Sequence, residues 1–126
     1  MDENFPIIDP HHHLWDLENH RYPWLQDGVK PIVFGDYTPL CKSYLLEDFL
    51  ADARDQNVVK SVHLDVGYDP ANPVGETRWL QALADRNGYP HGIVGYADLS
   101  RPDVEDLLAA HSEAPNFRGI RQSLNY

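Results

Sequence analysis

Apolar residues recur along the chain with two different periods, and these periods predict its secondary structure. Apolar positions three and four residues apart, the spacing of an amphipathic helix, occur in three stretches. Four runs rich in β-branched and apolar residues, bounded mostly by Gly, Pro, Asn or Asp, are typical of strands. The predicted strands are 5–9, 58–66, 91–97 and 117–122, and the predicted helices are 45–56, 76–87 and one from Pro102 or Asp103 through His111.

The order of these elements is strand, long loop, helix, strand, helix, strand, helix, strand. Strands that alternate with helices predict βαβ crossovers, and therefore an α/β fold with a parallel sheet. The length of 126 residues suits one domain with one core. Because no low-complexity stretch or linker marks an internal boundary, we expect residues 1–126 to belong to a single domain.

The second predicted strand has two chemically different faces. Strand residues alternate sides, so Val62 and Leu64 fall on one face, and the other face carries Ser61, His63 and Asp65. A strand that is buried on both sides and turns polar near its carboxyl end is typical of the mouth of a parallel barrel. An antiparallel strand with one face in water is the alternative interpretation.

Three residues near the predicted helices indicate how those helices begin and end. Glu76 would lie in a first turn, where a carboxylate interacts favourably with the helix dipole. Gly88 follows the same helix and is typical of a residue that ends one. Ser100 precedes the last helix and is predicted to cap its amino end.

Residues 14–43 have no clear periodicity and are rich in aromatic residues and proline. The stretch is too long for a simple connection between a strand and a helix, and long loops in compact domains tend to be lids or binding loops. Packing that only holds the loop in place is the alternative, and we favour it for all of its aromatic residues except Trp15.

Composition narrows the range of partners. The net charge of -10 argues against a nucleic acid or an anionic membrane, because both require a basic face. No apolar run approaches the roughly 20 residues of a membrane span, and the amino terminus lacks the pattern of a signal peptide. The single Cys41 has no internal disulfide partner, which favours a reducing compartment. We therefore expect a cytoplasmic protein.

The stretch from Ile7 to His13 carries the most pronounced chemical signal, because three consecutive histidines follow a short strand. If the strand continues, Asp9, His11 and His13 project to one side and His12 turns away. Neutral imidazole is a common ligand of zinc, and α/β folds place their chemistry at the carboxyl ends of strands. A surface histidine cluster is the alternative interpretation.

Further polar residues fall near the carboxyl ends of the later strands and would meet at the same edge of a parallel sheet. A metal held by two histidines and a carboxylate activates water and polarises a carbonyl, and arginine binds anionic or oxygen-rich groups. This set suits metal-assisted hydrolysis of an ester, lactone or amide. An equally good interpretation of His63 is a histidine of the core, in which case Asp65 would only orient its ring. The residues concerned are His63, Asp65, Asp98 and Arg121.

Four segments resemble one known family. They read Ile-Ile-Asp-Pro-His-His-His-Leu-Trp-Asp at 7–16, Val-His-Leu-Asp-Val-Gly-Tyr-Asp-Pro-Ala at 62–71, Gly-Ile-Val-Gly-Tyr-Ala-Asp-Leu at 92–99 and Phe-Arg-Gly-Ile-Arg-Gln at 117–122. In this order they resemble the amidohydrolase-related metal-dependent hydrolases of the TIM-barrel type. The branch that they resemble most is that of the sugar-lactone and 2-pyrone-4,6-dicarboxylate lactonases.

The resemblance implies a hydrolase that acts on a small-molecule lactone, either of a sugar acid or of a carboxylated compound. It implies that a divalent metal, zinc first, is held by His11 and His13. The residues that it places along the substrate pocket are Trp15, His63, Asp65 and Arg121. A decarboxylase of the same superfamily is one alternative, and a non-catalytic remnant or assembly module is another.

The chain also departs from the family. TIM barrels need roughly 200 to 250 residues, whereas only four strands are predicted here, so we expect a partial (β/α)8 barrel. The aspartate that serves such enzymes as general base would lie beyond Tyr126, so no catalytic base is expected within the chain. Two open sheet edges would favour a homo-oligomer or a missing carboxyl-terminal half. We therefore expect a truncated, amino-terminal half that is inactive by itself.

Overall fold

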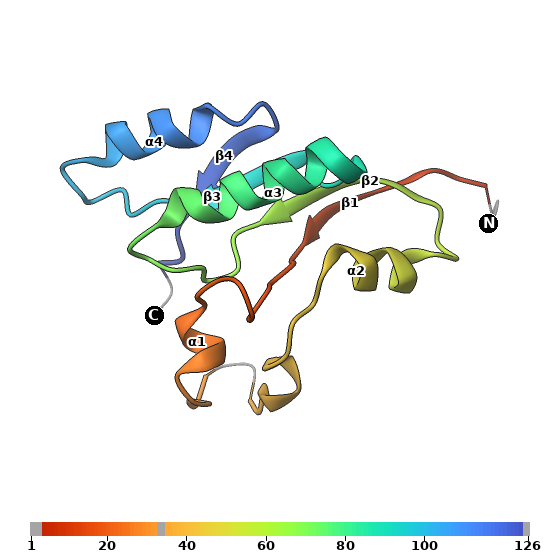
Figure 1. The fold of residues 1–126 in the computed structure, drawn as a ribbon, viewed down its shortest axis with the longest axis horizontal. Helices are drawn as coiled ribbons and strands as arrows, with labels where there is room; N and C mark the ends of the chain where they lie inside the picture. The colour runs from red at the N-terminus through yellow and green to blue at the C-terminus, as the bar shows by residue number, and fades with distance from the viewer. Residues whose placement is uncertain (1–3, 33–34, 125–126) are drawn as a thin grey trace.

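The computed structural model describes residues 4–32 and 35–124. Its four strands form one parallel sheet in the order β1-β2-β3-β4, which confirms the predicted α/β fold and excludes the antiparallel alternative for the second strand. Helices alternate with these strands along the chain (Figure 1). The strands are β1 Ile7–His12, β2 Val58–Leu64, β3 Gly92–Tyr96 and β4 Phe117–Arg121, and the helices are α1 Pro23–Gln26, the 3-10 turn η1 Thr38–Leu40, α2 Leu46–Ala53, α3 Pro73–Asn87 and α4 Val104–Ser112.

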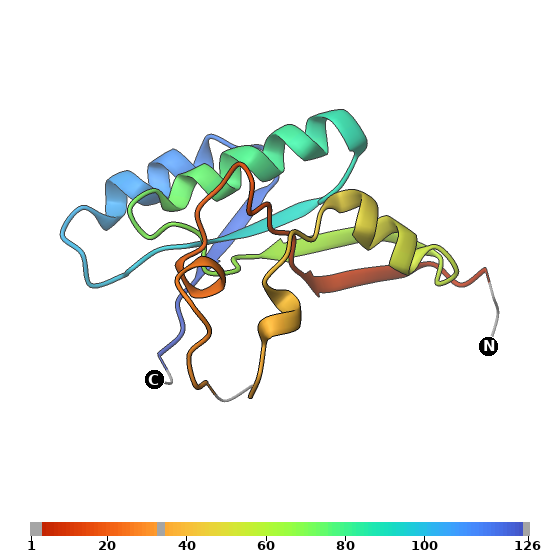
Figure 2. The same cartoon turned by 60° about the horizontal axis from the view of Figure 1, so that its bottom comes forward.

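The sheet is covered on one side. Helices α2, α3 and α4 lie on the same side of it (Figure 2). Helix α1 lies near the carboxyl ends of the strands (Figure 1). The core between sheet and helices is apolar and fully or almost fully buried, as expected for faces that must leave water together. Its residues are Leu14, Leu46, Phe49, Leu80 and Ile93.

The opposite face of the sheet is much more open. Ile8 is 57% exposed, and its register partner is Lys60. Leu64 and Val94 are paired across β2 and β3 and are only half-buried. Because strand residues alternate sides, these positions lie on the face that the helices leave uncovered.

Helix boundaries follow the sequence signals in part. Helix α3 begins at Pro73, three residues before the predicted start, because proline is well tolerated in a first turn. It ends as predicted, with Gly88 in the left-handed conformation at φ 83°. The predicted cap by Ser100 is wrong: its hydroxyl donates to Asp98 at 2.6 Å, and Asp103 occupies the N-cap position of α4.

The long segment between β1 and α2 is held in place by contacts between its two ends and by contacts with the region after β2. Trp15 and Tyr44 exchange two backbone hydrogen bonds of 2.9 Å, and their rings stack with centroids 5.3 Å apart. The Trp15 indole also donates to the carbonyl of Lys42. A second cluster holds the segment against the region after β2 and consists of the buried residues Tyr22, Leu25, Tyr37 and Val66.

None of the helices formed by residues 4–32 and 35–124 has both the length and the apolar character that are needed to cross a bilayer.

Candidate functional site

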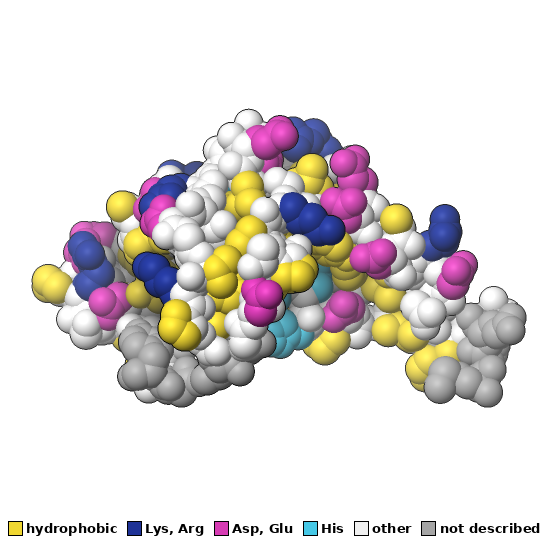
Figure 3. Space-filling view, turned by 90° about the horizontal axis from the view of Figure 1, so that it is seen from below, with side chains coloured by type: hydrophobic (Ala, Val, Ile, Leu, Met, Phe, Trp, Pro, Cys, Tyr) yellow, Lys and Arg dark blue, Asp and Glu magenta, His cyan; other side chains and the backbone are white. Residues whose placement is uncertain are grey.

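The two outer histidines of the triplet meet where β1 ends. The Nε2 atoms of His11 and His13 are 3.2 Å apart, and their rings are perpendicular with centroids 5.0 Å apart. Two nitrogen ligands of one tetrahedral zinc ion, each bound at about 2.0–2.1 Å, lie about 3.3–3.4 Å apart. The separation of the pair is close to this value, and it is also that of an N–H···N hydrogen bond between the two rings. Seen from below, histidine side chains form a group near the middle of the molecule (Figure 3).

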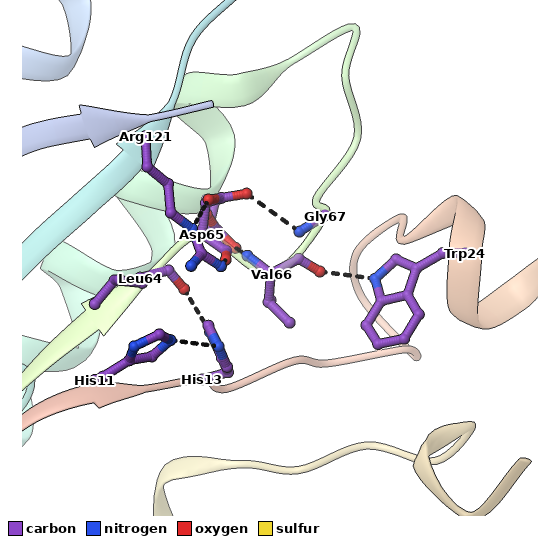
Figure 4. A network of polar contacts seen from close by, with 9 residues as sticks. His11, His13, Trp24, Leu64, Asp65, Val66, Gly67 and Arg121 are labelled. Carbon is purple, nitrogen blue, oxygen red and sulfur yellow. Dashed lines mark hydrogen bonds and ion pairs between the residues drawn. The ribbon is translucent and has the colours of Figure 1, made fainter. Parts of the chain in front are cut away.

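A backbone hydrogen bond orients one ring of this pair. The Nδ1 of His13 lies 2.8 Å from the carbonyl oxygen of Leu64, so Nδ1 carries the hydrogen and donates it (Figure 4). Burial lowers the pKa of His13, with a further decrease from the positive charge of Arg121. A neutral His13 in this tautomer presents the lone pair of Nε2 toward His11. A hydrogen bond from the other ring nitrogen to a carbonyl group is typical of histidines that hold a metal.

Asp9 does not join the two imidazoles. Its carboxylate accepts the backbone N–H of His11 at 3.0 Å. The pairing of β1 with β2 shifts between Asp9, which is opposite Ser61, and His12, which is opposite His63. The expected unbroken alternation from Asp9 to His13 is therefore wrong, because the irregularity changes which side the carboxylate faces.

Among the residues that the structure describes, no group of three or more His, Cys, Asp or Glu side chains is arranged to hold a metal ion. The two imidazoles alone are therefore not a complete set of metal ligands.

The remaining histidine of the triplet lies under the helices. His12 is 6% exposed, stacks on Phe49 of α2 at 4.2 Å and meets the ring of His63 at 5.5 Å. His63 is fully buried, and its Nε2 accepts the backbone N–H of Leu14 at 2.8 Å. Its register partner Ile93 belongs to the apolar core. This position of His63 matches the core-histidine alternative and lies on the helix-covered side of β2.

Burial also sets the charge state of these two residues. Desolvation lowers the pKa of His12 to about 4 and that of His63 well below its usual value, so both rings are neutral near pH 7. Four buried side-chain atoms in this region have no hydrogen-bond partner among the described residues. They are Nδ1 and Nε2 of His12, Oγ of Ser61 and Nδ1 of His63.

Asp65 and Arg121 form an ion pair across the carboxyl ends of β2 and β4. The Nε of Arg121 donates to the Asp65 carboxylate, and its Nη2 donates to the Asp65 carbonyl oxygen at 2.6 Å. The side chains are 13% and 36% exposed, respectively. The sequence predicted that both residues would lie at one edge of the sheet, and the structure joins them directly. Asp98, in contrast, bonds Ser100 and Gln122 in a turn.

A pocket of about 300 Å³ opens beside this ion pair. Asp65 lines it together with Trp24 of α1, Tyr68 of the loop after β2, and Tyr96 of β3. Trp15, which was predicted to line the substrate pocket, is not among the residues that line this one. It instead joins the two ends of the long segment through its contacts with Tyr44 and Lys42. Sequence reasoning missed Trp24 as a pocket residue, although the aromatic content of residues 14–43 was the signal that could have identified it.

Three successive carbonyl groups connect these parts of the site. Residues 64–66, which we name the strand-end segment, each accept a hydrogen bond from the side chain of a different element (Figure 4). Leu64 accepts from His13 at 2.8 Å, Asp65 from Arg121 and Val66 from the Trp24 indole at 2.8 Å. Of the three donors, His13 follows β1, Arg121 lies in β4 and Trp24 lies in α1. The end of β2 therefore sets the relative positions of the imidazole pair, the arginine and the pocket wall.

Comparison with known proteins finds two curated relatives. The chain is 69% identical over 120 residues to an uncharacterised protein of Sinorhizobium fredii, a match that covers 95% of this chain and 40% of the relative. It is 30% identical over 117 residues to an L-fucono-1,5-lactonase of Burkholderia ambifaria, which covers 93% of this chain and 36% of that enzyme.

No family model matches the chain, and no solved structure gives a significant match. The chain spans at most about two fifths of the length of the curated relatives that it matches. Over almost all of its own length, it is similar to part of a lactonase.

Proposed function

We propose that this chain carries part of the metal and substrate site of a lactone hydrolase of the amidohydrolase type. The observation that supports this most strongly is the His11–His13 pair, with 3.2 Å between the two Nε2 atoms and with His13 oriented by the Leu64 carbonyl. Similarity to an enzyme named as a lactonase supports the same reaction class. The proposed cofactor is one divalent metal ion, with zinc as the first candidate because imidazole nitrogen suits it.

A metal bound by the two imidazoles would supply a water molecule acidified to a pKa of about 7 and would polarise a carbonyl oxygen. The residues of the chain itself perform the binding and the orientation. Arg121 presents a guanidinium beside the pocket and suits the ring oxygens, hydroxyl groups or carboxylate of a lactone. Asp65 holds that guanidinium in place.

The size and the lining of the pocket support a small cyclic substrate. A volume of about 300 Å³ is at the lower end of the range for ligand pockets. The aromatic rings of Trp24 and Tyr68 offer flat apolar faces to a sugar-derived ring, and Asp65 offers acceptors to its hydroxyl groups. We propose a sugar-acid lactone, or a carboxylated lactone, as the substrate class.

The base for water attack is proposed to come from elsewhere. Asp65 is bonded to Arg121, and Asp9 is bonded to the His11 amide, so neither carboxylate is placed to take a proton from water. The open sheet face and the two edge strands, β1 and β4, suit additional βα units that would complete a (β/α)8 barrel. We propose that these units supply the base, either from the same polypeptide or from a second copy.

Metal binding provides the first test. The metal-free chain, its His11→Ala and His13→Ala variants, and the control His91→Gln would each be titrated with Co²⁺ and Zn²⁺ by absorbance and calorimetry. His91 precedes β3 at the opposite end of the sheet and serves as the matched control. Both alanine variants should bind at least a hundredfold more weakly, whereas the control should match the parent chain. Equal affinity in all four proteins would contradict the assigned ligands.

Lactone binding provides the second test. L-fucono-1,5-lactone and related aldonolactones would be added to the zinc-loaded chain, with the indole N–H of Trp24 and the Nε–H of Arg121 followed by NMR. Both resonances should shift at millimolar lactone, and Arg121→Lys should weaken binding. Acid release would be recorded in parallel. The absence of any shift in either resonance would contradict the proposed pocket.

A further inference from the structure

Glu76 is a buried carboxyl group for which the proposed reaction has no use. It lies near the start of α3 and is 1% exposed, an unusual location for glutamate. Burial raises its pKa to about 8, with a further increase from the negative charge of Asp65. Its Oε2 accepts the backbone N–H of Val66 at 3.3 Å. The side chain therefore contacts the strand-end segment directly.

Glu76 and Arg121 hold the same peptide unit from opposite ends. The carbonyl of Asp65 accepts from Arg121, and the N–H of Val66, which belongs to that same peptide group, donates to Glu76. The carbonyl groups on either side, of Leu64 and Val66, accept from His13 and Trp24. A peptide plane is rigid, so a change at its N–H also moves its carbonyl.

We propose that Glu76 is the positioning residue of this site: it fixes the Asp65–Val66 peptide, and through that peptide the imidazole pair, Arg121 and Trp24. Loss of its proton strengthens its hydrogen bond to the Val66 N–H but sets a second negative charge against Asp65, so the arrangement shifts and the site has a built-in response to alkaline pH. The biological role of this response rests on the proposed function. The physical coupling is independent of that function, because its contacts form without metal or substrate.

The charges around Glu76 determine the direction of the response. Asp65 and Arg121 face it from the ends of β2 and β4. The hydroxyl groups of Tyr22, just before α1, and Tyr68, in the loop after β2, also interact with it. Burial raises the pKa of both tyrosines, so they remain neutral while Glu76 titrates. An ionised Glu76 places a second negative charge near Asp65, and the two carboxylates then compete for a single guanidinium.

NMR titration of the metal-free chain tests the coupling. The backbone amide of Val66, the indole N–H of Trp24 and the Nε–H of Arg121 would be followed from pH 6 to 9.5. In the parent chain all three resonances should shift with one common midpoint near pH 8. In Glu76→Gln, whose amide oxygen still accepts the Val66 N–H but does not ionise, they should stay constant.

Glu105→Gln is the matched control, because Glu105 lies in the first turn of α4 but is exposed. It should titrate like the parent chain. Constant resonances in the parent, or an unchanged midpoint in Glu76→Gln, would overturn the proposal. Glu76→Ala removes the acceptor, so the Val66 amide should exchange faster than in Glu76→Gln at every pH. A chain that binds neither metal nor lactone but shows the Glu76-dependent titration would refute the proposed function and leave the coupling intact.

Discussion

Two pairs of histidines, one at the end of β1 and one shared between β1 and β2, differ in their surroundings. His11 and His13 lie at the open end of the sheet, with their Nε2 atoms facing each other. His12 and His63 lie under the helices, where burial lowers the pKa of both rings. His12 lies between His11 and His13 in the sequence, so packing and not chain position separates a candidate ligand from a core histidine. Buried polar groups should therefore govern stability and its pH dependence, whereas the open pair should govern ligand binding.

Glu76→Gln should produce the largest change in stability. The folded pKa of about 8 exceeds the unfolded value of 4.5, so the stability that the neutral carboxyl provides is lost as pH rises through this interval. The parent chain should lose up to about 4 kcal/mol of unfolding free energy between pH 4.5 and 8 from this group. Urea unfolding across that range should show a much flatter profile for the variant. Parallel profiles would show that Glu76 ionises freely in the folded chain.

His63→Ala should rank next, at about 3 kcal/mol of destabilisation. The substitution empties the space of a fully buried ring and leaves the Leu14 N–H without its acceptor. His11→Ala, on the open side, should change the unfolding free energy by less than about 0.5 kcal/mol. Chemical denaturation at pH 7.5 would compare them. An equal loss of unfolding free energy in His63→Ala and His11→Ala would contradict the distinction between the two histidine pairs.

His12→Phe should change how the unfolding free energy depends on pH. The folded pKa of about 4 lies below the unfolded value of 6.5, so the stability associated with the neutral ring is present above pH 6.5 and is lost as pH falls toward 4. The parent chain should therefore lose about 2 kcal/mol from this group between pH 7 and 5. Phenylalanine can still stack on Phe49 but does not titrate, so the variant should lose less. His11→Phe serves as the control and should retain the acid sensitivity of the parent.

Trp24→Phe should have the smallest effect, about 1 kcal/mol, because it deletes the indole hydrogen bond to the Val66 carbonyl but keeps an aromatic ring. Its effect on lactone binding should be larger than its effect on stability, because the ring lines the pocket beside Asp65. Thermal unfolding and NMR titration would measure the two quantities. An unchanged lactone affinity would place the substrate elsewhere.

Much of the local structure could be predicted, because it depends on short-range rules. The period of apolar residues identified all four strands and the three long helices, and Gly88 ended α3 as expected. Glu76 shows where such rules fail. Its position early in α3 favours a charged carboxylate, but burial against the end of β2 outweighs that preference and raises its pKa. No pattern within a single helix reveals which neighbouring element will cover it.

Patterns along the chain were sufficient to predict the order of the elements, the parallel α/β class and the alternation that sets His12 apart from His11 and His13. Packing between distant elements was needed to show that the helices cover the side of β2 that carries His63, and that a register shift turns Asp9 away. The same packing makes His13, Arg121 and Trp24 all donate to the strand-end segment. Periodicity acts over a few residues, whereas these contacts join residues from 42 to 56 positions apart.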